Sequence, residues 1–85
     1  MYMIRSVHHP AYKNLIAQLV KAREARGFTT REFAERVGMA QSFVTKTETR
    51  VRKLSLIEYL QYTDALGMSE TEAWELMQDM HRKLK

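Results

Sequence analysis

The stretch from Thr29 to Glu48, TTREFAERVGMAQSFVTKTE, constrains the fold more than any other part of this sequence. Thr29 and Glu32 have the spacing of a capping box, in which a hydroxyl and a carboxylate each accept a hydrogen bond from a free N–H at a helix start. Gly38 follows the first apolar stripe, and glycine adopts without steric cost the left-handed conformation that ends many helices. A second helix is expected from about Gln41. The stretch therefore predicts two short helices joined by a glycine turn.

The second of these helices has few apolar residues. Val44 is central to its apolar side, whereas Ser42, Lys46 and Thr49 lie on the opposite side when residues are spaced about 100° apart. A helix with a narrow inner stripe and a small polar outer surface is suited to contact another molecule.

Positive charge is concentrated in the part of the chain that contains this stretch. Residues 1–53 hold eleven Lys or Arg residues and four Glu residues, a formal charge of +7, whereas residues 54–85 hold three basic and six acidic residues, a formal charge of −3. A one-sided basic surface suits a nucleic-acid backbone, because binding to phosphates releases counterions. The alternative is a solvated surface that keeps the protein soluble.

The 85 residues are enough for one small domain with a single hydrophobic core. The lack of cysteine excludes disulfides and Cys-based zinc sites. No apolar run could span a membrane, and the start lacks the apolar stretch of a signal peptide, so we expect a cytoplasmic protein. There is no Gly-rich phosphate loop or H-E-x-x-H pattern. Of the three histidines, His8 and His9 are adjacent and His81 is far away in the sequence, so they do not form a ligand pattern. We therefore expect no enzymatic activity, no cofactor and no metal.

Helical periodicity predicts three more helices, and no run alternates with the period of a strand. The first extends from Pro10 to about Arg26, and the others cover 56–66 and about 70–82. Each of the last two follows a further capping box, Ser55 with Glu58 and Ser69 with Glu72. The expected fold class is all-α: one five-helix domain over 10–85. Residues 1–9 are expected to form a flexible tail, in which Arg5 is a candidate DNA-contacting arm.

The apolar residues that recur every three or four positions in the last two helices are expected to face the core. In the helix over 56–66 they are Leu56, Leu60 and Thr63, with Tyr59 or Leu66. In the helix over 70–82 and just beyond it they are Ala73, Leu76, Met77, Met80 and Leu84, with Trp74 beside them.

The chain resembles the lambda-repressor-like (Cro/repressor, XRE-type) helix-turn-helix family over about residues 14–67. The resemblance rests on AREARGFTTREFAERVGMAQSFVTKTE and on a later helix that ends in ALG. Ala34 stands at the small-residue position that lets the two helices approach, and Gly38 at the turn glycine. Val44 stands at the apolar position that locks the later helix onto the earlier one. The resemblance implies a lambda-repressor-like fold whose helix-turn-helix is formed by helices two and three of five.

The family also implies an ion pair between Arg23, in the first helix, and Glu48, at the end of the third.

Four positions depart from the family's pattern, namely Thr30, Ala40, Thr47 and Arg50. Thr30 has a shorter reach than the usual Gln, and the cap at Ala40 is weakened by about 1 kcal/mol. The core at Thr47 should be looser than with an aliphatic residue. Arg50 stands where the family usually has a glycine. It adds a positive charge, and the sequence does not fix the residue at which the third helix ends.

The resemblance implies that the third helix enters the DNA major groove with its N-terminal end first. Its foremost candidate for base readout is Gln41, whose amide can pair bidentately with adenine. The other candidates for base contacts are Ser42, Thr45 and Lys46. The candidates for contacts with the DNA backbone are Thr30, Arg50, Arg52 and Lys53. Phe43 either touches a base or sugar or covers side chains of the second helix.

These features predict a sequence-specific DNA-binding transcriptional regulator of prokaryotic or phage type. The simplest form is a small Cro-like repressor of a phage, mobile-element or autoregulated operon, which binds a palindromic operator in double-stranded DNA as a homodimer. The candidate dimer interface on the last helix consists of Trp74, Met77, Met80 and Leu84. Alternatively, this helix only completes the core. The alternative function is that of an antitoxin or other XRE-type module whose main partner is a protein.

Overall fold

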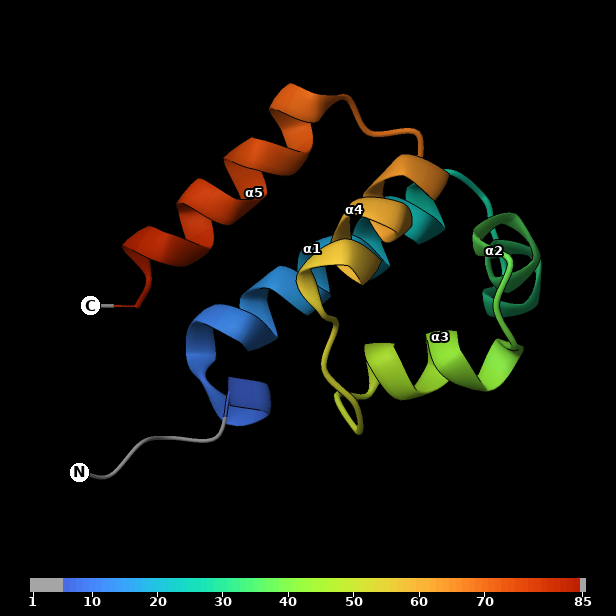
Figure 1. Cartoon of the computed structure of the whole chain (residues 1–85), viewed down its shortest axis with the longest axis horizontal. Helices are drawn as coiled ribbons and strands as arrows, with labels where there is room; N and C mark the ends of the chain where they lie inside the picture. The colour runs from blue at the N-terminus through green and yellow to red at the C-terminus, as the bar shows by residue number, and fades with distance from the viewer. Residues whose placement is uncertain (1–5, 85) are drawn as a thin grey trace.

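The computed structural model describes residues 6–84, which form five α-helices after a short 3₁₀ turn (Figure 1). The elements are η1 (Ser6–His8), α1 (Pro10–Ala25), α2 (Thr30–Val37), α3 (Gln41–Glu48), α4 (Leu56–Ala65) and α5 (Glu70–Arg82). No strand occurs within residues 6–84, so the predicted all-α, five-helix fold is confirmed. The helix ends differ from the predicted ends by at most one residue.

Local sequence signals account for most of these helix starts. Capping boxes open three of the helices, in the pairs Thr29 with Glu32, Ser55 with Glu58 and Ser69 with Glu72. In each pair the hydroxyl and the carboxylate accept hydrogen bonds from backbone N–H groups that have no partner inside the helix. By contrast the N-cap residue of α3 is Ala40, whose side chain has no hydrogen-bond acceptor.

The core lies between α1, α2, α3 and α4. Phe33 of α2 and Val44 of α3 are fully buried, and Leu19 of α1 is 1% exposed. The rings of Phe33 and Tyr62 meet edge to face, with centroids 4.7 Å apart. Such an aromatic pair adds about 1 kcal/mol to the free energy gained by burial alone. This core holds α2 and α3 in a fixed relation to the rest of the molecule.

Two overlapping apolar stripes run along α4, and the structure buries the one that contains the tyrosines. The prediction that Leu56 and Leu60 face the core is wrong, because these residues are 68% and 50% exposed. The prediction is confirmed for Thr63, Tyr59 and Leu66, which are buried, and the residue that it missed is Tyr62, 1% exposed. The two tyrosines remove more apolar surface from water than two leucines would. The Tyr59 hydroxyl donates to the Ala73 carbonyl at 2.7 Å, so burial leaves this polar group satisfied.

The last helix, α5, packs mainly on α1 (Figure 1) and is joined to α4 by the hydrogen bond from Tyr59 to Ala73. Ala73 is buried, as predicted, and the half-buried residues of the predicted stripe are Leu76, Met77 and Met80. The prediction that Leu84 completes this stripe is wrong, because Leu84 lies beyond the end of α5 and is 54% exposed. Trp74 is 63% exposed. One side of α5 therefore carries large apolar groups that the domain itself does not cover.

Part of the segment predicted as a tail is included in the described residues. Ser6–His8 form η1, which packs against α1, and the His9 side chain caps α1 by accepting a hydrogen bond from the Ala11 N–H at 3.0 Å. The expectations for residues 1–5, including the candidate arm at Arg5, lie outside the described residues. None of the helices over residues 6–84 is long and apolar enough to cross a membrane.

Candidate nucleic-acid interface

The turn between α2 and α3 brings the two helices into direct contact. Gly38 ends α2 with a φ of 81°, a left-handed conformation that side chains with a Cβ rarely adopt. The N–H groups of Gly38 and Met39 both donate to the Ala34 carbonyl, at 2.9 and 3.0 Å. Ala34 is 2% exposed and Val44 is fully buried. The small side chain and the tight turn together fix the angle at which α3 leaves α2.

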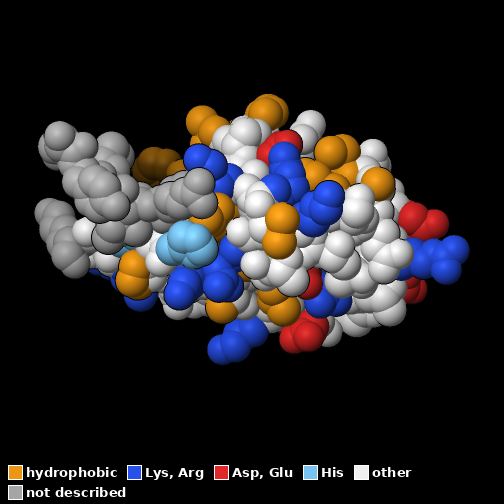
Figure 2. Space-filling model, turned by 90° about the horizontal axis from the view of Figure 1, so that it is seen from below, with side chains coloured by type: hydrophobic (Ala, Val, Ile, Leu, Met, Phe, Trp, Pro, Cys, Tyr) orange, Lys and Arg blue, Asp and Glu red, His pale blue; other side chains and the backbone are white. Residues whose placement is uncertain are grey.

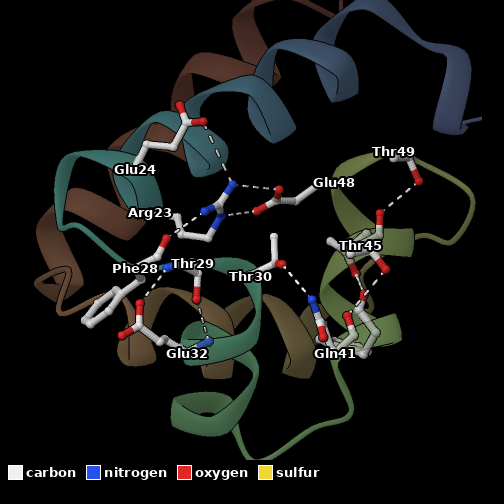
Figure 3. Close-up of polar contacts among 12 residues, drawn as sticks. Arg23, Glu24, Phe28, Thr29, Thr30, Glu32, Gln41, Thr45, Glu48 and Thr49 are labelled. Atoms are coloured by element: carbon white, nitrogen blue, oxygen red, sulfur yellow. Dashed lines mark hydrogen bonds and ion pairs between the residues drawn. The ribbon is translucent and has the colours of Figure 1, made fainter.

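Arg23 and Glu48 lie together and join the end of α1 to the end of α3 (Figure 3). The guanidinium donates to both Glu48 oxygens, at 2.6 and 3.1 Å, and to the Phe28 carbonyl at 2.6 Å. The two side chains are only 11% and 13% exposed. The hydrogen bond with Glu48 raises the pKa of Arg23 above its ordinary value. The Arg23 guanidinium therefore stays charged, and the pair fixes the C-terminal end of α3 against α1.

The outer side of α3 is polar and open to solvent. Gln41, Ser42, Thr45 and Lys46 are all exposed, which places the four candidates for base contacts on one accessible surface. The Thr45 hydroxyl donates to carbonyls of its own helix, at 3.2 and 3.4 Å. Its methyl group is therefore the part that is left for contact with another molecule.

Gln41 is the foremost candidate for base readout and Thr30 a candidate for contact with the DNA backbone. The structure brings the two side chains together across the turn (Figure 3). The Gln41 Nε2 donates to the Thr30 Oγ1 at 3.1 Å. The described part of the chain offers no further partner for the Gln41 side chain. One N–H and the Oε1 of this amide remain available, which is the pair of groups that adenine N7 and N6 require.

Of the two roles left open for Phe43, its burial disfavours a contact with a base or sugar, and the ring it lies near belongs to Tyr62 of α4. Phe43 is 8% exposed and belongs to the core, where its ring lies 6.3 Å from that of Tyr62. Thr47 is fully buried on the same side of α3, and its hydroxyl donates to the Phe43 carbonyl at 2.7 Å. The hydroxyl that departs from the family's pattern is therefore satisfied inside its own helix.

Arg50 stands at the end of α3 in a left-handed conformation, with a φ of 61°. Its N–H donates to the Thr47 carbonyl at 3.1 Å, and the Val51 N–H donates to the Lys46 carbonyl at 2.9 Å. These two hydrogen bonds form the Schellman motif that glycine usually completes. Arginine in place of the family's usual glycine therefore leaves the hydrogen bonds at the end of α3 intact. The Arg50 Nε is buried, without a hydrogen-bond partner among the residues that the structure describes.

Arg52, two residues further on, is engaged by the protein itself. Its guanidinium donates to both oxygens of Glu58, at 3.1 and 3.0 Å, and lies 4.5 Å from the centre of the Phe43 ring. The hydrogen bonds from Arg52, and next that from the Ser55 backbone, hold the pKa of Glu58 below its ordinary value. Lys53, by contrast, is exposed.

Figure 2 shows the molecule from below the view of Figure 1, the side on which α3 lies. Lys and Arg side chains are more prominent on this side than Asp and Glu. The basic residues of α3 and of the loop that follows it are Lys46, Arg50, Arg52 and Lys53. The polar surface of α3 therefore lies beside positive charge.

The sequence interpretation missed Glu58 as part of this region. It identified Glu58 only as a helix cap, although a carboxylate six residues after Arg52 at a helix start is a signal for such a pair. It also missed that Thr30 and Gln41 contact each other, because their distance in space depends on the turn angle.

Within residues 6–84 no three His, Asp or Glu side chains lie close enough together to hold a metal ion.

The residues predicted as a dimer interface line one open hollow on α5. The hollow has a volume of about 550 Å³, and the residues lining it are Trp74, Met77, Gln78, Met80, His81, Arg82 and Leu84. A second apolar hollow of about 160 Å³ adjoins it between α4 and α5 and shares Trp74 and Met77. The exposed apolar side of α5 is therefore continuous with the exposed side of α4.

Comparison with known proteins identifies relatives of this chain. Residues 15–76 match the sequence model of a helix-turn-helix domain family. Among solved structures, the chain is similar to an XRE-family like protein from Pseudomonas syringae pv. tomato str. DC3000. The two are 34% identical, the TM-score is 0.77, and the similarity covers 89% of each chain. No curated protein sequence matches this chain.

Proposed function

This chain belongs to the XRE-type helix-turn-helix family of DNA-binding regulators, and on that premise we propose that it is a sequence-specific transcriptional repressor. Its targets are an operon of a phage, of a mobile element or of its own gene, in the cytoplasm of a prokaryote. The observation that carries this proposal is the exposed amide of Gln41, oriented by Thr30 at the start of α3 beside a basic loop.

The first part of the proposal is base readout by α3. With α3 in the major groove, the free N–H of Gln41 donates to adenine N7 and its Oε1 accepts from adenine N6. Ser42 and Lys46 contact neighbouring base edges, and the methyl group of Thr45 suits thymine. Every one of these side chains is exposed, so none must leave the core to reach DNA.

The second part of the proposal is the set of contacts with the phosphates of the DNA backbone. The Thr30 hydroxyl accepts its hydrogen bond from Gln41, so its own proton is free to be donated to a phosphate. The same residue then orients the reading amide and anchors α2 on the backbone. Arg50 and Lys53 contact phosphates from the loop after α3, where neither is paired with a carboxylate within residues 6–84.

The third part is dimerisation through α5 on a palindromic operator. A second copy of the chain fits the hollow on α5, because antiparallel pairing of two α5 helices places acidic first turns against basic last turns. The first turn of α5 contains Glu70 and Glu72, and the last contains His81 and Arg82. Pairing would also cover Trp74, which the domain itself leaves 63% exposed.

A genome-wide selection of DNA fragments by the purified protein at near-physiological salt tests this function. We expect one enriched palindrome with half-sites about one helical turn, roughly 34 Å, apart. Its position would identify the regulated genes. Salt-sensitive binding without enrichment, or no binding, would refute sequence-specific regulation and favour the antitoxin or protein-binding role, for which a pull-down is the next experiment.

A further inference from the structure

Among the basic residues that follow α3, Arg52 differs from its neighbours in how its charge is used. Two of its N–H groups donate to the two oxygens of Glu58, at 3.1 and 3.0 Å. Its guanidinium also lies over the ring of Phe43, 4.5 Å from the ring centre. Its side chain is 33% exposed, and that of Glu58 is 21% exposed. The charge of Arg52 is thus largely neutralised before any DNA arrives.

A phosphate would have to compete with this arrangement. To reach DNA, Arg52 would give up a bidentate pair and leave the carboxylate of Glu58 facing the phosphates. Glu58 is not free to turn away, because its Oε1 also accepts a hydrogen bond from the Ser55 N–H at 2.8 Å. The intact pair releases few counterions from DNA, since its net charge is zero.

The contacts of Arg52 connect three parts of the molecule. Phe43 belongs to α3, Glu58 to the first turn of α4, and Arg52 to the loop between them. That loop also contains Arg50, whose left-handed conformation is unfavourable for a residue with a side chain and persists only where neighbouring contacts hold it.

We propose that Arg52 is a positioning residue and not a phosphate contact: with Glu58 and Phe43 it forms a clamp that fixes the loop so that Arg50 and Lys53 meet the DNA backbone. This inference rests on the proposed DNA-binding function. It replaces the expectation that all three basic residues of the loop act in the same way.

Four variants test the clamp on a fixed mixed-sequence duplex several helical turns long, with affinity measured over a range of salt concentrations. Arg52→Ala should weaken binding about tenfold and leave the slope of log affinity against log salt unchanged. Arg52→Lys should behave like Arg52→Ala, because an ammonium group cannot form the bidentate pair. Glu58→Gln should also weaken binding, although glutamine still serves in a capping box. Lys53→Ala is the control that should lower the slope by about one.

The opposite pattern would overturn the clamp. If Arg52 contacts a phosphate, Arg52→Ala lowers the slope by about one, and Arg52→Lys retains most of the binding. If Glu58 only holds Arg52 back, Glu58→Gln tightens binding.

Hydrogen exchange of the free protein separates failure of the clamp from failure of the proposed function. The Ser55 N–H, which donates to Glu58, should exchange several-fold faster in Arg52→Ala and in Arg52→Lys than in the unchanged protein. Unchanged exchange would overturn the clamp whether or not DNA binds. A protein that binds no duplex but shows the faster exchange would refute the proposed function and retain the clamp.

Discussion

Arg23 and Glu48 are each so deeply placed that either residue alone would leave a poorly solvated charge. Their side chains are 11% and 13% exposed, and the guanidinium also donates to the Phe28 carbonyl. We therefore predict that Arg23→Met lowers the free energy of unfolding by about 3 kcal/mol, because Glu48 loses its partner. Urea unfolding at neutral pH measures this change.

The double variant Arg23→Met with Glu48→Met distinguishes a buried charge from lost packing. It should recover part of the stability, because neither charge then remains inside. Arg26→Met is the matched control, since Arg26 is exposed and, within residues 6–84, its side chain donates only to the Ala22 carbonyl of α1. A loss for Arg23→Met no greater than for Arg26→Met would contradict the structural role of the pair.

Gln41 carries the second prediction at this scale. Gln41→Ala should weaken binding to the operator by about 1–3 kcal/mol and relax the choice at one base pair, because the amide no longer reads adenine. Competition binding against operators altered at single positions measures both effects. Thr30→Val should weaken binding to every sequence, since it removes a phosphate contact, and most on the operator, since it also removes the hydrogen bond that orients the Gln41 amide. An equal loss for Gln41→Ala on operator and mixed-sequence DNA would show that Gln41 does not read bases.

At the scale of the helices, the signals that predict structure are short in range. The helix starts follow from capping boxes such as Thr29 with Glu32, and the end of α2 follows from Gly38, because each signal acts within one turn. The buried side of α4 could not be predicted in the same way. Its two apolar stripes are equally periodic, and the choice between Leu60 and Tyr62 depends on the space beside Phe33.

In the candidate site, too, the features set by local sequence were predictable and those set by packing between helices were not. The exposed residues of α3 were predictable, because their positions follow from helical geometry once Val44 is placed inside. The use of Arg52 was not, because its partner Glu58 belongs to another helix and its contact with Phe43 requires that ring to be at the edge of the core. Local pattern thus identified the residues, and packing determined which charges remain free.

The end of α3 gives the prediction at the scale of an element. Arg50→Gly should raise the free energy of unfolding by about 1 kcal/mol, because glycine adopts a φ of 61° without the steric cost that arginine bears there. The same change should lower the salt slope of DNA binding by about one, since it removes a phosphate contact. Thermal unfolding and salt titration measure the two effects.

Two further variants separate conformation from charge at this position. Arg50→Ala should lower the salt slope equally but bring no such stabilisation, because alanine keeps the unfavourable conformation. Thr49→Gly is the backbone control: its φ is −90°, so glycine there should destabilise the protein. If Arg50→Gly is less stable than the unchanged protein, the side chain of Arg50 contributes more to packing than its conformation costs.

At the scale of the whole molecule, the two exposed surfaces lie on different sides. The basic side with α3 faces away from α5 (Figure 1). In the proposed dimer, two copies joined through α5 leave both α3 helices exposed, as binding to two half-sites about one DNA turn, roughly 34 Å, apart requires. Under the proposed function a single α3 would read only a few base pairs, so the proposed dimer would supply most of the specificity.

Trp74 is the residue on which this assembly can be tested. Trp74→Ala should shift the sedimenting mass toward the monomer, because the side chain lies 63% exposed at the hollow that a second copy would fill. Stability at low protein concentration should change little, since little apolar surface is buried there within one chain. Ile57→Ala is the matched control, because Ile57 is 62% exposed but does not line the hollow. Trp74→Ala protein that sediments as the unchanged protein does but unfolds more readily would place Trp74 in the core and the dimer contact elsewhere.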